Sequence, residues 1–185
     1  ISISLIIPPA SLTIIIPAYN EAGTIGPVLE RLTAHLATMG KNYEILVICD
    51  GATDATAEEV RRVDGLVRLI EHPYNMGNGA AVKTGIRNAR GAVVVFMDAD
   101  GQHAPEDMER LLEECDRYDM VVGARGKGSQ AGWHRALANG IYNLLASYVT
   151  GRRIEDLTSG FRAMRRDVAR RFVSLLPNGY SYPTT

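Results

Sequence analysis

Two aspartates one residue apart, followed closely by a glutamine, are the side chains in this sequence best suited to chemistry. Asp98, Asp100 and Gln102 come directly after residues 93–97, a run of five apolar residues without a polar interruption. Side chains alternate along an extended chain, so Asp98 and Asp100 would point the same way. Carboxylate and amide oxygens suit Mg²⁺ or Mn²⁺, and such an ion suits a diphosphate. The alternative is a strand that ends in an ordinary acidic turn.

The elements that must position these acids are read from the apolar pattern. Runs with the length and composition of buried strands occur at 12–16, 44–49, 66–70 and 93–97. Helical stretches are expected between them at 29–39, 55–63 and 80–90. This alternation predicts an α/β fold with a mainly parallel sheet flanked by helices. Such sheets bind ligands at the carboxyl ends of their strands.

Further polar side chains follow the predicted strands. Tyr19 offers a flat ring on which a base could stack. Asp50, followed by Gly51, could accept hydrogen bonds from a base or a ribose, or could instead cap the next helix. Arg125 ends a short strand predicted at 119–125, and residues 156–164 join a polar turn to another short strand.

A glycine-rich loop precedes the helix expected at 80–90. Gly77 and Gly79 could let backbone N–H groups approach an anion at the start of this helix, with Lys83 one turn further along. The glycine spacing differs from that of a dinucleotide-binding fingerprint. His72, beside a proline in the same loop, is interpreted as a loop residue.

Composition and charge narrow the class of protein. The 185 residues suit one domain, and Cys49 and Cys115 form neither a disulfide framework nor a metal-ligand spacing, which favours a reducing compartment.

Residues 1–120 carry 10 Lys and Arg against 18 Asp and Glu, whereas residues 121–185 carry 10 against 3. A nucleic-acid-binding domain would be basic overall, so this class is disfavoured. The basic end fits a phosphorylated ligand, an anionic membrane surface, or both, and the alternative is a solvated basic face. A long amphipathic helix at 133–150 is expected to pack on the core rather than on lipid.

Six short motifs, taken together and in this order, resemble the inverting glycosyltransferases of family 2, which have the GT-A fold. They are IPAYNE at 16–21, DGATD at 50–54, NMGNG at 75–79, DADGQ at 98–102, VGAR at 122–125 and TSGFR at 158–162. The last two are most similar to the dolichol-phosphate mannosyltransferase branch and its bacterial polyprenyl-phosphate relatives.

The resemblance implies a role for each residue that matches a motif. The nucleoside would be held by Pro17, Ala18, Tyr19, Glu21 and Asp50, and the nucleotide by Asp98, Ala99 and Asp100. The metal would be bound by Asp100 and Gln102, with Asp98. Acceptor or donor phosphates would be bound by Arg125 together with Arg135 or Arg162, and Ser159 would lie beside the acceptor.

Two departures from the family pattern bear on these expectations. Cys49 stands where the family usually has the first of two aspartates, which leaves Asp50 to make the nucleoside contact. The chain ends at residue 185, where relatives continue. Residues 1–185 are therefore expected to be a single GT-A catalytic domain truncated at its C-terminus.

The chemistry implied is one in-line displacement at the anomeric carbon of a UDP- or GDP-sugar. The metal, with Lys83 or Arg125, would stabilise the leaving diphosphate. A polyprenyl (dolichyl or undecaprenyl) phosphate acceptor, with a second pKa of about 6, needs no general base. A sugar hydroxyl would need one, for which Glu155 and Asp156 are the candidates. The basic C-terminal part favours the phosphate acceptor and a protein at the cytoplasmic face of a membrane.

Three alternatives stay open at this point. The first is a soluble family 2 enzyme that transfers sugar to a hydroxyl of a polysaccharide or glycan. The second is a sugar nucleotidyltransferase, although those enzymes generally have a glycine-rich basic loop after the first strand, where this chain has residues 17–21. The third is a nucleotide-binding regulatory domain without activity, against which the presence of both Asp98 and Asp100 argues.

Overall fold

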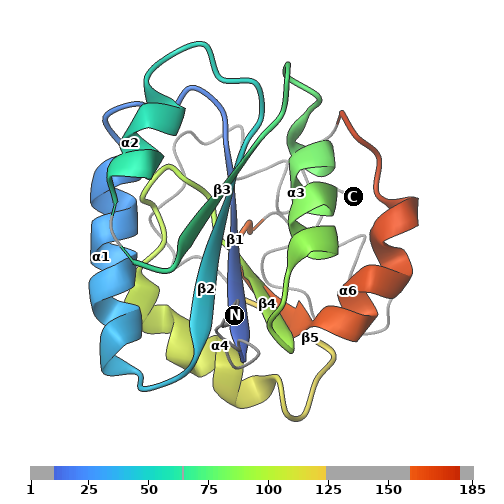
Figure 1. The fold of residues 1–185 in the computed structure, drawn as a ribbon. Coiled ribbons are helices and arrows are strands. Elements are labelled where there is room, and N and C mark those ends of the chain that lie inside the picture. The colour runs from blue at the N-terminus through green and yellow to red at the C-terminus, as the bar shows by residue number, and fades with distance from the viewer. Residues whose placement is uncertain (1–10, 64, 124–158, 180–185) are drawn as a thin grey trace, which may run out of the picture.

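A six-stranded sheet runs through the centre of the computed structural model, which describes residues 11–63, 65–123 and 159–179. The strands are β1 Leu12–Ala18, β2 Tyr43–Cys49, β3 Val67–Glu71, β4 Val93–Phe96, β5 Met120–Val122 and β6 Arg162–Arg165. Their order is β3-β2-β1-β4-β6-β5 (Figure 1). β1 to β4 are mutually parallel, and β6 runs antiparallel to β4 and β5. The prediction of a mainly parallel α/β sheet is confirmed.

Helices cover both faces of this sheet. They are α1 Ile25–Thr38, α2 Thr56–Arg62, α3 Asn78–Asn88, α4 Met108–Glu114 and α6 Arg166–Phe172, with short 3₁₀ turns η1 Pro105–Asp107 and η2 Val173–Leu175. α1, α2 and α4 lie on one face, and α3 and α6 lie on the other (Figure 1). None of the helices within the described ranges is long and apolar enough to cross a membrane.

The central strand β1 shows why the sheet is covered on both sides. Ile14 and Ile16 pack in one apolar cluster with Leu32 of α1, whereas Ile15 packs in another with Ile86 of α3. All five side chains are essentially inaccessible to solvent. Burying a side chain of this size contributes about 1.5–3 kcal/mol, so the continuous apolar run of β1 is stable only between two layers of helices.

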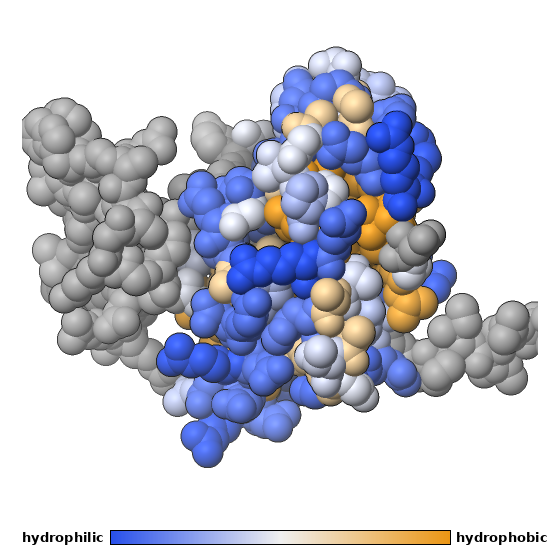
Figure 2. All heavy atoms as spheres, turned by 90° about the vertical axis from the view of Figure 1, so that its left-hand side faces the viewer, coloured by the Kyte–Doolittle hydropathy of each residue, from blue (hydrophilic) through white to orange (hydrophobic). Residues whose placement is uncertain are grey.

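The outer surface of α1 and α2 is polar, as expected for helices that bury one face. Hydrophilic side chains predominate on this side of the molecule, and apolar ones show only in small patches between them (Figure 2). The buried positions of α1 are Ile25, Val28, Leu29, Leu32 and Leu36, which recur at helical spacing. This helix begins four residues before the predicted stretch at 29–39.

A buried carboxylate organises the end of the sheet opposite the strands' carboxyl ends. Glu44 accepts hydrogen bonds from Thr13 Oγ1 at 2.8 Å, from Arg68 Nη1 at 2.6 Å and from the backbone N–H of Arg90 at 2.7 Å. Burial alone would raise the pKa of Glu44, but these hydrogen bonds and the Arg68 charge outweigh it and lower the pKa. Glu44 is therefore held as a charged group that joins β1, β2, β3 and the turn before β4.

Candidate active site

A cavity of about 350 Å³ opens at the carboxyl ends of β1, β2 and β4. Its walls come from the end of β1, the first residue after β2, the start of α3 with the loop before it, and the turn after β4. The lining residues are Pro17, Ala18, Tyr19, Glu21, Asp50, Asn75, Asn78, Ala81, Asp98, Ala99 and Asp100. The volume is in the usual range of small-molecule sites, about 300–1,000 Å³.

Most residues predicted to hold the nucleotide meet in this cavity. Those brought together are Pro17, Ala18, Tyr19, Glu21, Asp50, Asp98, Ala99 and Asp100. Tyr19 is 45% exposed, so one part of its side chain is accessible to a ligand. Three lining residues were not predicted as site residues: Asn75, Asn78 and Ala81. Asn75 and Asn78 belong to the NMGNG motif, which was the signal in the sequence.

Asp98 and Asp100 reach the same cavity through a turn. β4 ends at Phe96, and residues 99–100 are in a turn that Gly101 continues with φ +73°. The expected continuation of an extended strand is therefore wrong, although its result, two carboxylates facing one cavity, holds. Gln102 is exposed and is not among the lining residues. Its backbone N–H donates to Asp100 Oδ1 at 2.9 Å.

The carboxylate of Asp98 lies against residues from the far end of the described chain. Its Oδ2 is 3.4 Å from Nε2 of His103, whose ring stacks on Phe161 with centroids 5.1 Å apart. A Cβ placed on Gly160 would lie 2.1 Å from the same oxygen. Gly160 and Phe161 of the TSGFR motif therefore lie beside Asp98 and His103, a contact that the separate motifs did not reveal.

The other predicted acceptor-side residues are buried or lie elsewhere. Ser159 is fully buried, and its hydroxyl accepts the N–H of Phe161 at 3.2 Å. Arg162 is 8% exposed, and its Nε donates to the carbonyl oxygen of Ser159 at 2.8 Å. Neither residue lines the cavity. The remaining candidates, Arg125, Arg135, Glu155 and Asp156, lie outside the described residues.

Negative charge accumulates in the cavity. The pKa of Glu21 is raised, first by burial and then by the charges of Asp100, Asp54 and Asp98. Among the described residues, no three His, Cys, Asp or Glu side chains are placed to hold a metal ion by themselves. Mg²⁺ characteristically binds one or two carboxylates and completes its shell with phosphate oxygens and water, so Asp98 and Asp100 fit that mode of binding.

The loop that carries Tyr19 and Glu21 is fixed by residues around the start of α2. The backbone N–H of Glu21 donates to Thr56 Oγ1 at 2.8 Å, and that of Ala22 donates to Asp54 Oδ2 at 3.0 Å. Asn20, which has φ +56°, accepts the N–H of Thr53 at 2.8 Å. The IPAYNE and DGATD motifs are therefore one structural unit.

The glycine loop before α3, where the sequence predicted an anion site, packs against the segment after η2. Lys83 Nζ donates to the carbonyl oxygen of Leu176 at 2.9 Å, and the N–H of Ala80 donates to that of Asn178 at 3.3 Å. A Cβ on Gly77 would lie 2.4 Å from the Asn178 oxygen, and one on Gly79 would lie 2.0 Å from the Pro177 oxygen. The small residues and the lysine here accommodate the segment after η2. Lys83 is thus not brought into the cavity.

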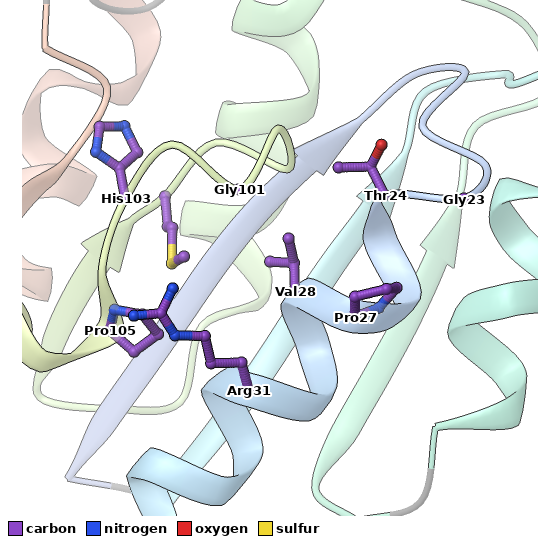
Figure 3. A pocket seen from close by; sticks show the side chains of 9 residues that line it. Gly23, Thr24, Pro27, Val28, Arg31, Gly101, His103 and Pro105 are labelled. Atoms are coloured by element: carbon purple, nitrogen blue, oxygen red, sulfur yellow. The ribbon is translucent and has the colours of Figure 1, made fainter. Parts of the chain in front are cut away.

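A second cavity, of about 310 Å³, lies on the other side of the turn after β4. Figure 3 shows its walls: Thr24, Pro27, Val28 and Arg31 come from the start of α1, and Gly101, His103 and Pro105 from the chain after β4. No carboxylate lines it, and Arg31 is paired with Glu106 at 2.8 Å. The chemistry of a metal and a diphosphate therefore fits the first cavity.

Comparison with known proteins identifies the family. The model of "Glycosyl transferase family 2" matches residues 13–172, which include nearly all of the sheet and the whole cavity. The chain belongs to glycosyl transferase family 2. This confirms the resemblance drawn from the six motifs.

The names of two similar curated proteins refer to polyprenyl phosphates. The chain is 31% identical, over 93% of its length, to undecaprenyl-phosphate 4-deoxy-4-formamido-L-arabinose transferase from Edwardsiella ictaluri, of which it covers 57%. It is 29% identical, over 85% of its length, to dodecaprenyl-phosphate galacturonate synthase from Rhizobium johnstonii, of which it covers 48%. The chain spans about half the length of the curated relatives it matches.

Two solved structures of sugar-phosphoglycerate synthases share the fold of this chain. Mannosyl-3-phosphoglycerate synthase from Rubrobacter xylanophilus superposes with a TM-score of 0.70 at 19% identity, over 86% of this chain and 54% of that one. Glucosyl-3-phosphoglycerate synthase from Mycobacterium tuberculosis, in complex with Mn²⁺ and UDP-glucose, gives 0.67 at 20% identity, over 86% and 57%. The chain therefore has the GT-A fold expected from its sequence.

Proposed function

We propose that this chain is the donor-binding part of a metal-dependent inverting glycosyltransferase that transfers a sugar from a nucleoside diphosphate to a polyprenyl phosphate. The observation that carries the proposal is the single cavity in which Tyr19, Glu21, Asp98 and Asp100 meet. The names of the relatives, which are undecaprenyl- or dodecaprenyl-phosphate enzymes, support the acceptor. A place at the cytoplasmic face of a membrane, in peripheral contact with it, belongs to the same proposal.

The chain's own residues account for donor binding as follows. Tyr19, exposed at the cavity, would stack on the base, and Pro17 and Ala18 line the same cavity. Asp98 and Asp100 are the residues that would hold Mg²⁺ or Mn²⁺. When bound, the metal supplies charge stabilisation to the departing diphosphate. Burial and then the negative charges of Asp100 and Asp98 raise the pKa of Glu21, and a cation bound by these two aspartates would reduce the repulsion from those charges. Metal binding would in this way favour the ionised form of a residue that lines the donor cavity.

The acceptor side is proposed from the sequence and the relatives. A phosphate monoester is already an anionic nucleophile near neutral pH, so no protein base has to remove a proton. Arg125, with Arg135 or Arg162, would attract that anion, and Ser159 would lie near it. A hydroxyl acceptor would instead require Asp156 or Glu155 as a base.

A thermal-shift panel tests donor and metal together. UDP, GDP and their sugars are added with and without Mn²⁺ to the wild-type chain and to Asp100→Asn. A ligand at a free concentration of about a hundred times its Kd raises the free energy of unfolding by about 2.7 kcal/mol. For a domain of this size, this raises the melting temperature by about 5–10 °C. We expect one nucleotide to give this shift only with Mn²⁺, and the variant to lose it. A shift of equal size without metal, or in Asp100→Asn, contradicts the assignment.

Transfer assays decide the acceptor. The full-length protein is supplied with the donor that binds and with either undecaprenyl phosphate or a sugar hydroxyl acceptor. Transfer to the lipid phosphate at an unchanged rate in Asp156→Asn supports the proposal. Transfer only to hydroxyls, abolished in that variant, would establish the polysaccharide or glycan alternative instead.

A further inference from the structure

Asp50, the first residue after β2, uses most of its hydrogen-bonding capacity within the protein. Asp50 is 3% exposed although it lines the cavity. Its Oδ1 accepts the N–H of Met76 at 3.0 Å, and its Oδ2 accepts the N–H of Gly77 at 2.8 Å. A third bond joins Oδ1 to Nδ1 of His72 at 2.6 Å. A carboxylate has about four acceptor positions, so at most one remains for a ligand.

His72 is held between Asp50 and α3. Its Nε2 lies 2.9 Å from Thr84 Oγ1, and its side chain is 8% exposed. An ionised carboxylate only accepts hydrogen bonds, so Nδ1 of His72 must carry a proton and donate it to Asp50. In the neutral ring, Nε2 then accepts from the hydroxyl of Thr84. The ring is thus locked at both nitrogens, which is the arrangement of a side chain that orients another group.

The two backbone N–H groups that Asp50 binds lie between the two asparagines of the cavity wall. Asn75 and Asn78 line the cavity, and Met76 and Gly77 separate them. The loop is also in close backbone contact with Gly51: a Cβ there would lie 2.2 Å from the carbonyl carbon of Tyr74. The backbone of the loop between the two asparagines is therefore held by its hydrogen bonds to Asp50.

We propose that His72 is a positioning residue of the donor site. It fixes the carboxylate of Asp50, which in turn holds the backbone of residues 76–77 and so the shape of the cavity wall to which Asn75 and Asn78 belong. Asn75 Oδ1 accepts the N–H of Gly77 at 3.0 Å, and its amide nitrogen is a donor of the kind that the edge of a base or a ribose can accept. The inference rests on the proposed function in taking a nucleoside diphosphate as the ligand.

Two substitutions of His72 separate its two hydrogen bonds. His72→Asn places an amide nitrogen near the position of Nδ1, so it keeps a donor for Asp50 and loses Thr84. His72→Gln places its amide near Nε2, so it keeps Thr84 and loses Asp50. Thr84→Val removes the same bond as His72→Asn and serves as the matched control. Melting temperatures of all three variants report any general loss of folding.

Amide hydrogen exchange and nucleotide binding are then measured on each variant. In His72→Gln we expect faster exchange at Met76 and Gly77. We also expect a Kd for UDP or GDP with Mn²⁺ that rises about tenfold to a hundredfold, the value of a lost hydrogen bond to a charged group. KM for the donor should rise more than kcat falls. His72→Asn and Thr84→Val should stay within about threefold of the wild type in Kd, because the bond to Asp50 survives.

Clear outcomes overturn the proposal. Equal losses of affinity in His72→Asn and His72→Gln, in proportion to their melting temperatures, would show a merely structural role. Unchanged exchange at Met76 and Gly77 in His72→Gln would show that His72 does not hold the loop. If the wild type binds neither UDP nor GDP, the proposed function fails, and the exchange comparison still decides whether His72 positions residues 76–77.

Discussion

Gly160 offers a direct way to displace Asp98 without altering Asp98 itself. A Cβ at this position would lie 2.1 Å from Oδ2 and 2.6 Å from Cγ of the Asp98 carboxylate. Ordinary van der Waals contact begins at 3.4 Å, so in Gly160→Ala the carboxylate oxygen must retreat by about 1.3 Å. The Asp98 side chain is 42% exposed, and its Oδ2 lies 3.4 Å from His103 Nε2, so we expect the methyl group to be accommodated by a movement of this carboxylate away from Gly160.

The expected result is a large loss of activity with little loss of stability. A misplacement of about 1 Å in a catalytic group reduces the rate by about a hundredfold. We therefore expect kcat/KM for sugar transfer to undecaprenyl phosphate to fall by about that factor in Gly160→Ala. The affinity for Mn²⁺, measured by calorimetry in the presence of UDP or GDP, should fall as well. The melting temperature should change by no more than about 3 °C.

Gly179→Ala is the matched control, because no atom lies within 4 Å of a Cβ placed there. This variant should keep the activity, the Mn²⁺ affinity and the melting temperature of the wild type. Wild-type kcat/KM and Mn²⁺ affinity in Gly160→Ala would refute the reasoning, since the carboxylate would have moved without consequence. A collapse of the melting temperature in that variant would show instead that Gly160 is required for folding.

Three further predictions concern stability and charge. Glu44→Gln should lower the free energy of unfolding by about 2 kcal/mol at pH 7. Because the pKa of Glu44 in the folded protein is lowered from 4.5, this difference between the two proteins should be present above pH 4.5 and disappear as the pH falls below it. Denaturant titrations at several pH values measure the difference. Gly85→Ala should destabilise the protein by about 1–3 kcal/mol, because its Cβ would lie 2.3 Å from a methyl group of Ile15. Gly26→Ala is its control and should not lower the melting temperature, because its Cβ would make an ordinary contact, 3.6 Å from Glu59 Oε2. The affinity for Mn²⁺ should begin to fall at a pH above 4.5 as the pH is lowered, because the pKa of Glu21 is raised and its protonation removes a negative charge from the cavity. Calorimetry on Glu21→Gln should therefore show an Mn²⁺ affinity that depends less on pH.

Much of the fold follows from local patterns in the sequence. Continuous apolar runs such as residues 12–16 and 93–97 can be stable only inside a covered sheet, and the helical spacing of Leu29, Leu32 and Leu36 supplies the cover. The polar residues that follow these runs then collect at one edge of the sheet. This is why Tyr19, Asp50, Asp98 and Asp100 could be predicted at one site without coordinates, whereas Asn75, Asn78 and Ala81 were not.

Other features depend on partners far away in the chain. The insertion of β6, antiparallel, between β4 and β5 brings Gly160 and Phe161 beside Asp98 and His103. No local pattern encodes that neighbour, because it is set by how the whole sheet closes.

Within the residues that the structure describes, the sequence alone determined the type of the predicted strands and helices and the acids at the ends of the strands, because periodicity and composition act over a few residues. The helix expected at 133–150 lies outside those residues. The tertiary structure decided which groups are available to a ligand. Lys83 is held by Leu176, and Asp50 by His72, Met76 and Gly77, across separations of up to 93 residues. A buried donor or acceptor must find a partner, and only the folded chain determines whether that partner is a ligand or the protein itself.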